Sequence, residues 1–235
     1  MTKIQAVMFD LGNTLTTDIS LTDGLTSIEG SSICDDLELD IKQLNALGDE
    51  IDRCIAKLYT NNNTNQPHWL DIWQQASISI GLNFSSYEIE RLCRAHLKAF
   101  VRGCTVKPYS IPLLKYLKDR QIPLCLVSNM TGPVDVFDEG LREKGLAKFF
   151  DAVVWSSEIS FRKPNAKIFE LALKKLNVEA SKDIWMVGDR ERADIIGGQA
   201  LGLTTVRVIA NQQDKNSSAD YVVDGSNILE FFYSS

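Results

Sequence analysis

The fold is decided by Ala6-Val7-Met8-Phe9-Asp10-Leu11-Gly12-Asn13-Thr14-Leu15, an apolar run that ends at a carboxylate and a glycine. The run predicts a short buried strand with Asp10 at its C-terminal end. In α/β proteins ligands bind at the carboxyl ends of the strands, so this carboxylate is placed to act as a nucleophile or a metal ligand. Taken alone, an Asp after a strand also often hydrogen-bonds a neighbouring loop and does no chemistry.

Three later segments also end in, or contain, a polar group suited to chemistry. They are Leu-Cys-Leu-Val-Ser-Asn at 124–129, Phe-Arg-Lys-Pro-Asn at 161–165 and Ile-Trp-Met-Val-Gly-Asp at 184–189. Each polar residue has an ordinary alternative, with Ser128 as a strand-end hydroxyl and Lys163 as a solvated loop lysine. An ordered set of four such segments is hard to obtain by chance.

The ordered set resembles the four sequence motifs of the haloacid dehalogenase-like superfamily. The motif residues are Asp10, Ser128, Lys163, Gly188-Asp189 and Asp194. The resemblance implies an α/β, Rossmann-like three-layer core with a parallel sheet, and a helical cap domain of the C1 type inserted after the first motif, as in subfamily I. The implied core is residues 1–16 with 104–235, and the implied cap is residues 17–103.

Composition limits the classes of partner. A chain of 235 residues with 44% hydrophobic content can bury a full core and a smaller accessory domain. A net charge of −6 without a cluster of Lys or Arg argues against nucleic acid or an anionic membrane as a partner. Five cysteines without a C-x-x-C pair predict reduced thiols. The first strand starts too early for a signal peptide, so we expect a cytoplasmic protein.

Residues 17–103 carry apolar residues at helical spacing. One helix is predicted to end near the polar run 61–65, with a face made of Leu37, Ile41, Leu44, Ile51, Ile55 and Leu58. A second is predicted over 69–76, started near Pro67, and a third over 89–100, preceded by a capping box at 85–88. Together these helices predict a small bundle.

After residue 103, strand and helix patterns alternate, which predicts a parallel sheet with crossover helices. Strands are predicted at 124–127, 152–155, 184–187 and 205–209, and helices at 111–118, 134–144, 167–176 and 193–201. After a polar loop at 211–219, a short strand at 221–223 and a helix at 228–232 are predicted.

A phosphate monoester resists a carboxylate nucleophile unless cations and donors neutralise the charge on its oxygens. By the resemblance, Asp10 is the nucleophile that takes the phosphoryl group as an aspartyl-phosphate. Mg²⁺ is expected to bridge Asp10 and the phosphate, with Asp189 and the backbone carbonyl of Gly12 as further ligands. Hard oxygen ligands of this kind suit Mg²⁺.

The resemblance also assigns the groups that hold the phosphate of a small phosphorylated metabolite. Lys163 offsets negative charge, and the phosphoryl oxygens are held by Ser128 and by the turns at Leu11, Gly12 and Asn129. Thr14 and Asp194 are expected just outside the metal ligands. For Asp194, a purely electrostatic role at a helix N-terminus is an equal alternative.

The sequence departs from the family pattern at Gly12, where phosphatases of the family usually carry a second Asp that protonates the leaving group. Loss of a general acid typically costs on the order of 10²–10⁴-fold in rate. A phosphatase in which Asp18, Glu191 or a cap residue replaces that acid is the favoured interpretation. A dehalogenase, a phosphonate hydrolase using Lys42 or Lys57, and a binding protein without turnover stay open as alternatives.

Overall fold

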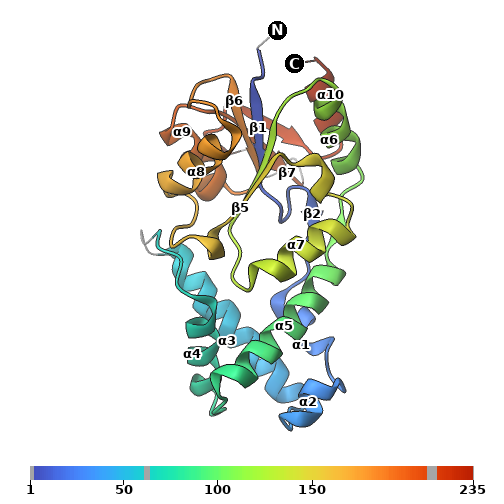
Figure 1. Cartoon of the computed structure of the whole chain (residues 1–235), viewed down its shortest axis with the longest axis vertical. Helices are drawn as coiled ribbons and strands as arrows, with labels where there is room; N and C mark the ends of the chain where they lie inside the picture. The colour runs from blue at the N-terminus through green and yellow to red at the C-terminus, as the bar shows by residue number, and fades with distance from the viewer. Residues whose placement is uncertain (1–2, 61–63, 211–215, 235) are drawn as a thin grey trace.

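The computed structural model describes residues 3–60, 64–210 and 216–234. Figure 1 shows a sheet flanked by helices and, at the other end of the molecule, a group of helices formed by the segment between β2 (Thr16–Thr17) and β3 (Thr105–Val106). Six parallel strands form the sheet in the order β5-β4-β1-β6-β7-β8. They are β1 (Ala6–Phe9), β4 (Leu124–Ser128), β5 (Ala152–Trp155), β6 (Ile184–Gly188), β7 (Thr204–Ile209) and β8 (Tyr221–Asp224).

Strand β1 lies inside the sheet, between β4 and β6. Its four residues are fully buried because helices cover both faces. Val7 and Phe9 pack into the larger apolar cluster, whereas Ala6 and Met8 pack into the smaller one on the opposite face. The continuous apolar run of β1 is therefore required by burial on two sides.

The helices of the core form the two outer layers. One face is covered by α8 (Ala166–Leu176) and α9 (Gly197–Ala200), and the other by α6 (Ser110–Asp119), α7 (Val134–Glu143) and α10 (Ile228–Ser234) (Figure 1). This arrangement confirms the predicted α/β class with a three-layer, Rossmann-like core. The predicted strands are all present, with bounds that differ by at most one residue.

One predicted helix, over 193–201, is wrong in detail. The segment Glu191–Ile196 forms a π-helical turn, and a regular helix, α9, begins only at Gly197. The wider turn folds the Asp194 side chain back under Gly188, where an added Cβ would lie 2.3 Å from the Asp194 carboxyl carbon. Single π turns of this kind occur often at functional sites.

The segment between β2 and β3 contains five helices among its described residues. They are α1 (Leu21–Thr26), α2 (Ser32–Asp36), α3 (Ile41–Thr60), α4 (Trp69–Ser79) and α5 (Ser86–Gly103). The capping box of Ser85 and Glu88 is confirmed at the start of α5. The short helices α1 and α2 were not predicted, because fewer than two turns carry no readable apolar period. We call residues 17–103 the helical insertion.

Two further predictions for the helical insertion are wrong. Leu37 does not belong to the long helix, because it ends α2 and is followed by Glu38 at φ 53°. Pro67 lies before the N-cap residue of α4, His68, and outside the first turn. The predicted polar residues 61–63 and part of the predicted loop, residues 211–215, lie outside the described residues.

The helical insertion is joined to the core by two adjacent chain crossings. The short strands β2 (Thr16–Thr17) and β3 (Thr105–Val106) pair antiparallel at these crossings. They lie at the predicted limits of the two domains, although the division of the chain into two domains stays a prediction. Helix α5 also packs closely on α7, since a Cβ at Gly140 would lie 2.2 Å from a methyl carbon of Val101.

Two general features of the described residues bear on the sequence predictions. None of the described helices combines the length and the apolar character needed to cross a membrane. All five cysteines are buried free thiols, which agrees with the prediction of reduced cysteines. The tertiary structure therefore uses them as packing residues.

We predict that His96 makes the fold sensitive to acid. Its side chain is 1% exposed, between Trp73 and Phe100, and burial lowers its pKa from 6.5 to about 4. Between pH 6.5 and 4, His96 is therefore protonated in the unfolded chain and neutral in the folded one. The free energy of unfolding falls as the pH drops through that window. From pH 7 to 5 this loss is about 2 kcal/mol.

Urea unfolding of the wild type and of His96→Leu at both pH values checks this prediction. The difference between the two proteins isolates His96 from the other titrating groups. An equal loss of stability in both proteins would contradict it.

Candidate active site

The order of the strands places the first, second and fourth motifs together. Asp10 follows β1, Ser128 ends β4 and Asp189 follows β6, and these three strands are adjacent and parallel. Their carboxyl ends therefore open at one edge of the sheet. The Asp10 N–H donates to the carbonyl of Val187 at 2.9 Å, which fixes the start of the loop after β1.

Lys163 lies at the centre of the site. Its side chain is 2% exposed, and Nζ lies 2.6 Å from Asp10 Oδ1 and 2.6 Å from Asp194 Oδ1. Burial lowers the pKa of Lys163, but the charges of Asp10 and Asp194 outweigh this effect and hold the pKa above its usual range. Ser128 Oγ donates to the same oxygen of Asp10 at 3.3 Å. Asp10 is thus held by a permanent cation and a hydroxyl.

Asp194 contacts both Lys163 and the main chain. Its Oδ2 accepts from the backbone N–H of Arg190 at 3.0 Å, while Oδ1 holds Lys163. Burial, together with the negative charge of Asp10, raises the pKa of Asp194 to about 6 in spite of the lysine. The contact with the Arg190 N–H agrees with a role for Asp194 at the start of the turn, and its contact with Lys163 orients the lysine. A position just outside the metal ligands stays a prediction.

Asn129 has a role that the sequence did not reveal. Its side-chain amide donates to the Lys163 carbonyl at 3.0 Å and accepts from the Lys163 N–H at 2.8 Å. The prediction for Asn129 concerned only its backbone N–H. The side chain fixes the main chain that carries the lysine, and no local sequence signal connects residues 129 and 163.

The turn after β1 is held from two sides. The Leu11 carbonyl accepts from the backbone N–H groups of the following turn, including that of Leu15 at 2.8 Å. From the segment after β3, Lys107 donates to the Asn13 carbonyl and Tyr109 donates to the Thr14 carbonyl. No local pattern in the sequence indicated these two contacts, because they depend on the chain returning from the helical insertion beside β1.

The carboxylates at the sheet edge form a group suited to a metal ion. Asp10, Asp189 and Asp194 each offer an oxygen within 4.8 Å of the others. Burial, and then the charges of Asp10 and Asp194, raise the pKa of Asp189 to about 7. Thr14 Oγ1 donates to Asp189 at 3.5 Å. Three carboxylates beside one lysine leave excess negative charge, so the residues present fit a divalent cation.

A cavity of about 270 Å³ opens between the sheet edge and the helical insertion. The core lines it with Asn13, Asn129, Arg162 and Arg190, and the insertion lines it with Ile55 and Phe100. Mixed polar and apolar walls of this kind suit a small polar ligand. Three residues of its wall, Asn129, Arg162 and Arg190, are adjacent in the chain to the motif residues Ser128, Lys163 and Asp189.

The comparisons with known proteins agree with this geometry. The family model of the haloacid dehalogenase-like hydrolases matches residues 4–202, which is most of the chain. The chain belongs to this family of hydrolases, as the ordered motifs predicted. The C1 type of the cap stays a prediction.

The relatives include enzymes with phosphatase names. The pyrimidine 5'-nucleotidase YjjG of Escherichia coli is 29% identical over 160 residues, covering 64% of this chain and 70% of that protein. A glyceraldehyde 3-phosphate phosphatase of Methanopyrus kandleri is 30% identical over 210 residues, covering 87% and 84%. Among solved structures, the magnesium-bound hydrolase YfnB of Bacillus subtilis has a TM-score of 0.70 at 18% identity, covering 99% and 100%.

We predict that Asp189 destabilises the metal-free protein and stabilises the loaded one. At pH 8, above the pKa of about 7, a partly buried, ionised Asp189 lies next to two other carboxylates. Asp189→Asn should therefore raise the melting temperature in EDTA, at about 2–4 °C for each kcal/mol in a chain of this size. With Mg²⁺ at about 10 mM, the wild type should have the higher melting temperature, because a bound cation stabilises only the protein that holds it.

Thermal unfolding in EDTA and in Mg²⁺ measures both effects. Asp52→Asn, a change at another carboxylate that lines the cavity, is the matched control. A Mg²⁺ response of equal size in the wild type and Asp189→Asn would contradict the prediction.

Proposed function

We propose that this protein is a Mg²⁺-dependent phosphatase that removes phosphate from a small metabolite through an aspartyl-phosphate on Asp10. The observation that carries the proposal is the buried contact of Asp10 with both Lys163 and Ser128. A carboxylate oriented by a cation and a hydroxyl is a preorganised nucleophile for a charged ester. The names of two relatives, a pyrimidine 5'-nucleotidase and a glyceraldehyde 3-phosphate phosphatase, support the same reaction.

In the proposed reaction, Asp10 attacks the phosphorus atom while Lys163 offsets the negative charge between the two groups. The Ser128 hydroxyl and the backbone N–H groups of Leu11, Gly12 and Asn129 would hold the phosphoryl oxygens. Asp10, Asp189 and the Gly12 carbonyl would hold Mg²⁺, which supplies positive charge to the phosphate when bound. Thr14 and Asp194 would orient Asp189 and Lys163.

The helical insertion is proposed to act as a cap that closes over the site and selects the substrate. The cavity between the insertion and the core supports this role, since both parts line it. Closing a site expels water, which strengthens the electrostatic contacts inside it. A cytoplasmic location without a nucleic-acid or membrane partner remains part of the proposal, in line with the net charge of −6.

The alternative reactions make less use of these residues. A dehalogenase of this family needs no metal, and the group formed by Asp10, Asp189 and Asp194 gives it no advantage. A phosphonate hydrolase would need a lysine as a Schiff base, and neither Lys42 nor Lys57 is among the described residues that line the cavity. A binding protein would not need the buried nucleophile.

We predict that Asp10→Asn abolishes phosphate release, because the amide cannot form the phospho-enzyme. The assay measures Mg²⁺-dependent phosphate from 4-nitrophenyl phosphate and from a panel of sugar and nucleotide monophosphates. Asp52→Asn is the control for a change of charge at the cavity wall, and thermal unfolding checks that each variant is folded. Turnover by Asp10→Asn at the wild-type rate would overturn the mechanism.

Trapping separates an enzyme from a binding protein. Beryllium fluoride with Mg²⁺ imitates the phosphoryl group on an aspartate, so it should raise the melting temperature of the wild type and leave Asp10→Asn unchanged. An absence of both trapping and phosphate release would favour a binding protein, and halide or phosphonate cleavage in the same assay would replace the proposed reaction.

A further inference from the structure

The proposed reaction lacks a proton donor at residue 12. When Asp10 displaces an alcohol, the leaving oxygen needs a proton, because an alkoxide is a poor leaving group. Gly12 has no side chain to supply one. A replacement must bring a carboxyl group to the place that a side chain at residue 12 would occupy.

Asp18 fills that place. A Cβ added to Gly12 would lie 2.3 Å from Asp18 Oδ2, far inside van der Waals contact. The backbone of Gly12 is not among the residues with positive φ, so its conformation alone does not require glycine. The space taken by the Asp18 carboxyl group explains the glycine instead.

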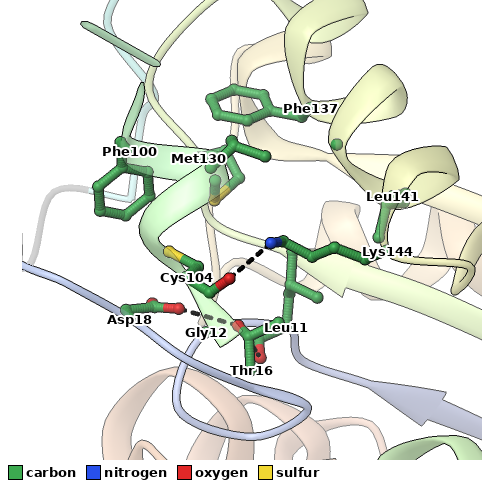
Figure 2. A pocket seen from close by; sticks show the side chains of 12 residues that line it. Leu11, Gly12, Thr16, Asp18, Phe100, Cys104, Met130, Phe137, Leu141 and Lys144 are labelled. Carbon is green, nitrogen blue, oxygen red and sulfur yellow. Dashed lines mark hydrogen bonds between the residues drawn. The ribbon is translucent and has the colours of Figure 1, made fainter. Parts of the chain in front are cut away.

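The Asp18 side chain is held in this position from one side. Thr16 Oγ1, in β2, donates to Asp18 Oδ1 at 2.9 Å, so Oδ2 is the oxygen directed at Gly12 (Figure 2). Asp18 also lines the cavity between the core and the insertion, next to Asn13 and Asn129. Its carboxyl group therefore belongs to the segment that joins the core to the insertion, residues 16–18, which we call the hinge segment, and also to the wall of the cavity.

Glu191, the other named candidate for the missing acid, makes contacts away from Gly12. Its carboxylate accepts hydrogen bonds from the Ser217 hydroxyl at 2.5 Å and from the Ser218 N–H at 2.7 Å. It also faces Arg207 at 3.5 Å. These contacts give Glu191 a structural role, since they join the π-helical turn to the segment before β8.

We propose that Asp18 is the general acid and base of this enzyme and replaces the side chain absent at Gly12. This inference rests on the proposed phosphatase function. In the first step an Asp10 oxygen bonds to phosphorus, the bond from phosphorus to the ester oxygen breaks, and that oxygen keeps the electron pair and takes the Asp18 proton. The product alcohol leaves.

In the second step a water oxygen bonds to phosphorus and gives one proton to the Asp18 carboxylate. The bond between phosphorus and Asp10 breaks, its electron pair returns to Asp10, and inorganic phosphate leaves. Asp18 ends the cycle protonated and Asp10 ends it ionised, as both began. One carboxyl group from the hinge segment thus serves both halves of the reaction.

Leaving-group dependence tests this role. Asp18→Asn keeps the shape and an acceptor for Thr16, but it has no carboxyl proton to give. The first substrate is the alkyl phosphate of the panel on which the wild type turns over fastest. On it we expect the turnover of Asp18→Asn to fall on the order of 10²–10⁴-fold. With 4-nitrophenyl phosphate the first step hardly needs a proton, so rapid mixing should show a burst of nitrophenol of about one equivalent, followed by slow turnover.

A second variant moves the carboxyl group to residue 12. Gly12→Asp combined with Asp18→Ala, which vacates the place beside residue 12, should raise the alkyl phosphatase activity at least about tenfold above that of Asp18→Ala. Gly12→Asp alone crowds two carboxyl groups into one place and should gain nothing. Asp119→Asn, at an exposed carboxylate of α6 that pairs with Lys115 outside the cavity, should keep the wild-type ratio of rates on the two esters.

The outcomes separate the two proposals. Equal losses on both esters without a burst, or no loss at all, would overturn the role of Asp18 and leave the phosphatase intact. If the double variant does not recover activity, Asp18 does not take over the role of a side chain at residue 12. Wild-type protein that releases phosphate from neither ester, in Mg²⁺, would overturn the proposed function and this inference together.

Discussion

The ammonium group of Lys163, buried between Asp10 and Asp194, is the interaction on which the site depends. Removing one partner of such a buried group leaves an uncompensated charge, at a cost of about 3–5 kcal/mol. Three loops must therefore meet at one point: the loop after β1, the loop before α8 and the π-helical turn after β6. Asn129 adds a fourth constraint, since its side chain binds the main chain of Lys163.

The residues around this interaction carry an excess of negative charge. Asp10, Asp189 and Asp194 lie close together, and burial, followed by the charges of the other two carboxylates, raises the pKa of Asp189 to about 7. Such an arrangement costs stability in the empty protein. It gives in return a place where a divalent cation and a phosphoryl group complete the charge balance, which is how a preorganised active site acts on an anionic ester.

The helical insertion takes part in the site through the segment that joins it to the core. Asp18 lies directly after β2, and β2 pairs with β3 where the chain returns. Lys107 and Tyr109, just beyond β3, hold the loop after β1. A movement of the insertion about this pair of strands would therefore move Asp18 relative to Asp10, which links closure to the proton donor in our proposal.

The sequence by itself determined the family, the parallel sheet and the motif residues, because each depends on local patterns: apolar runs of strand length, and a polar residue where each run ends. It did not determine α1 and α2, the π-helical turn at Glu191–Ile196, or the contacts of Asn129, Lys107 and Asp18. Those contacts join residues that are distant along the chain or depend on how a loop folds back. The contacts of Asn129 depend on the meeting of two core loops, and those of Lys107 and Asp18 depend on how the chain leaves the sheet for the insertion and returns from it. The glycine at residue 12 is understood only when Asp18 is seen against it.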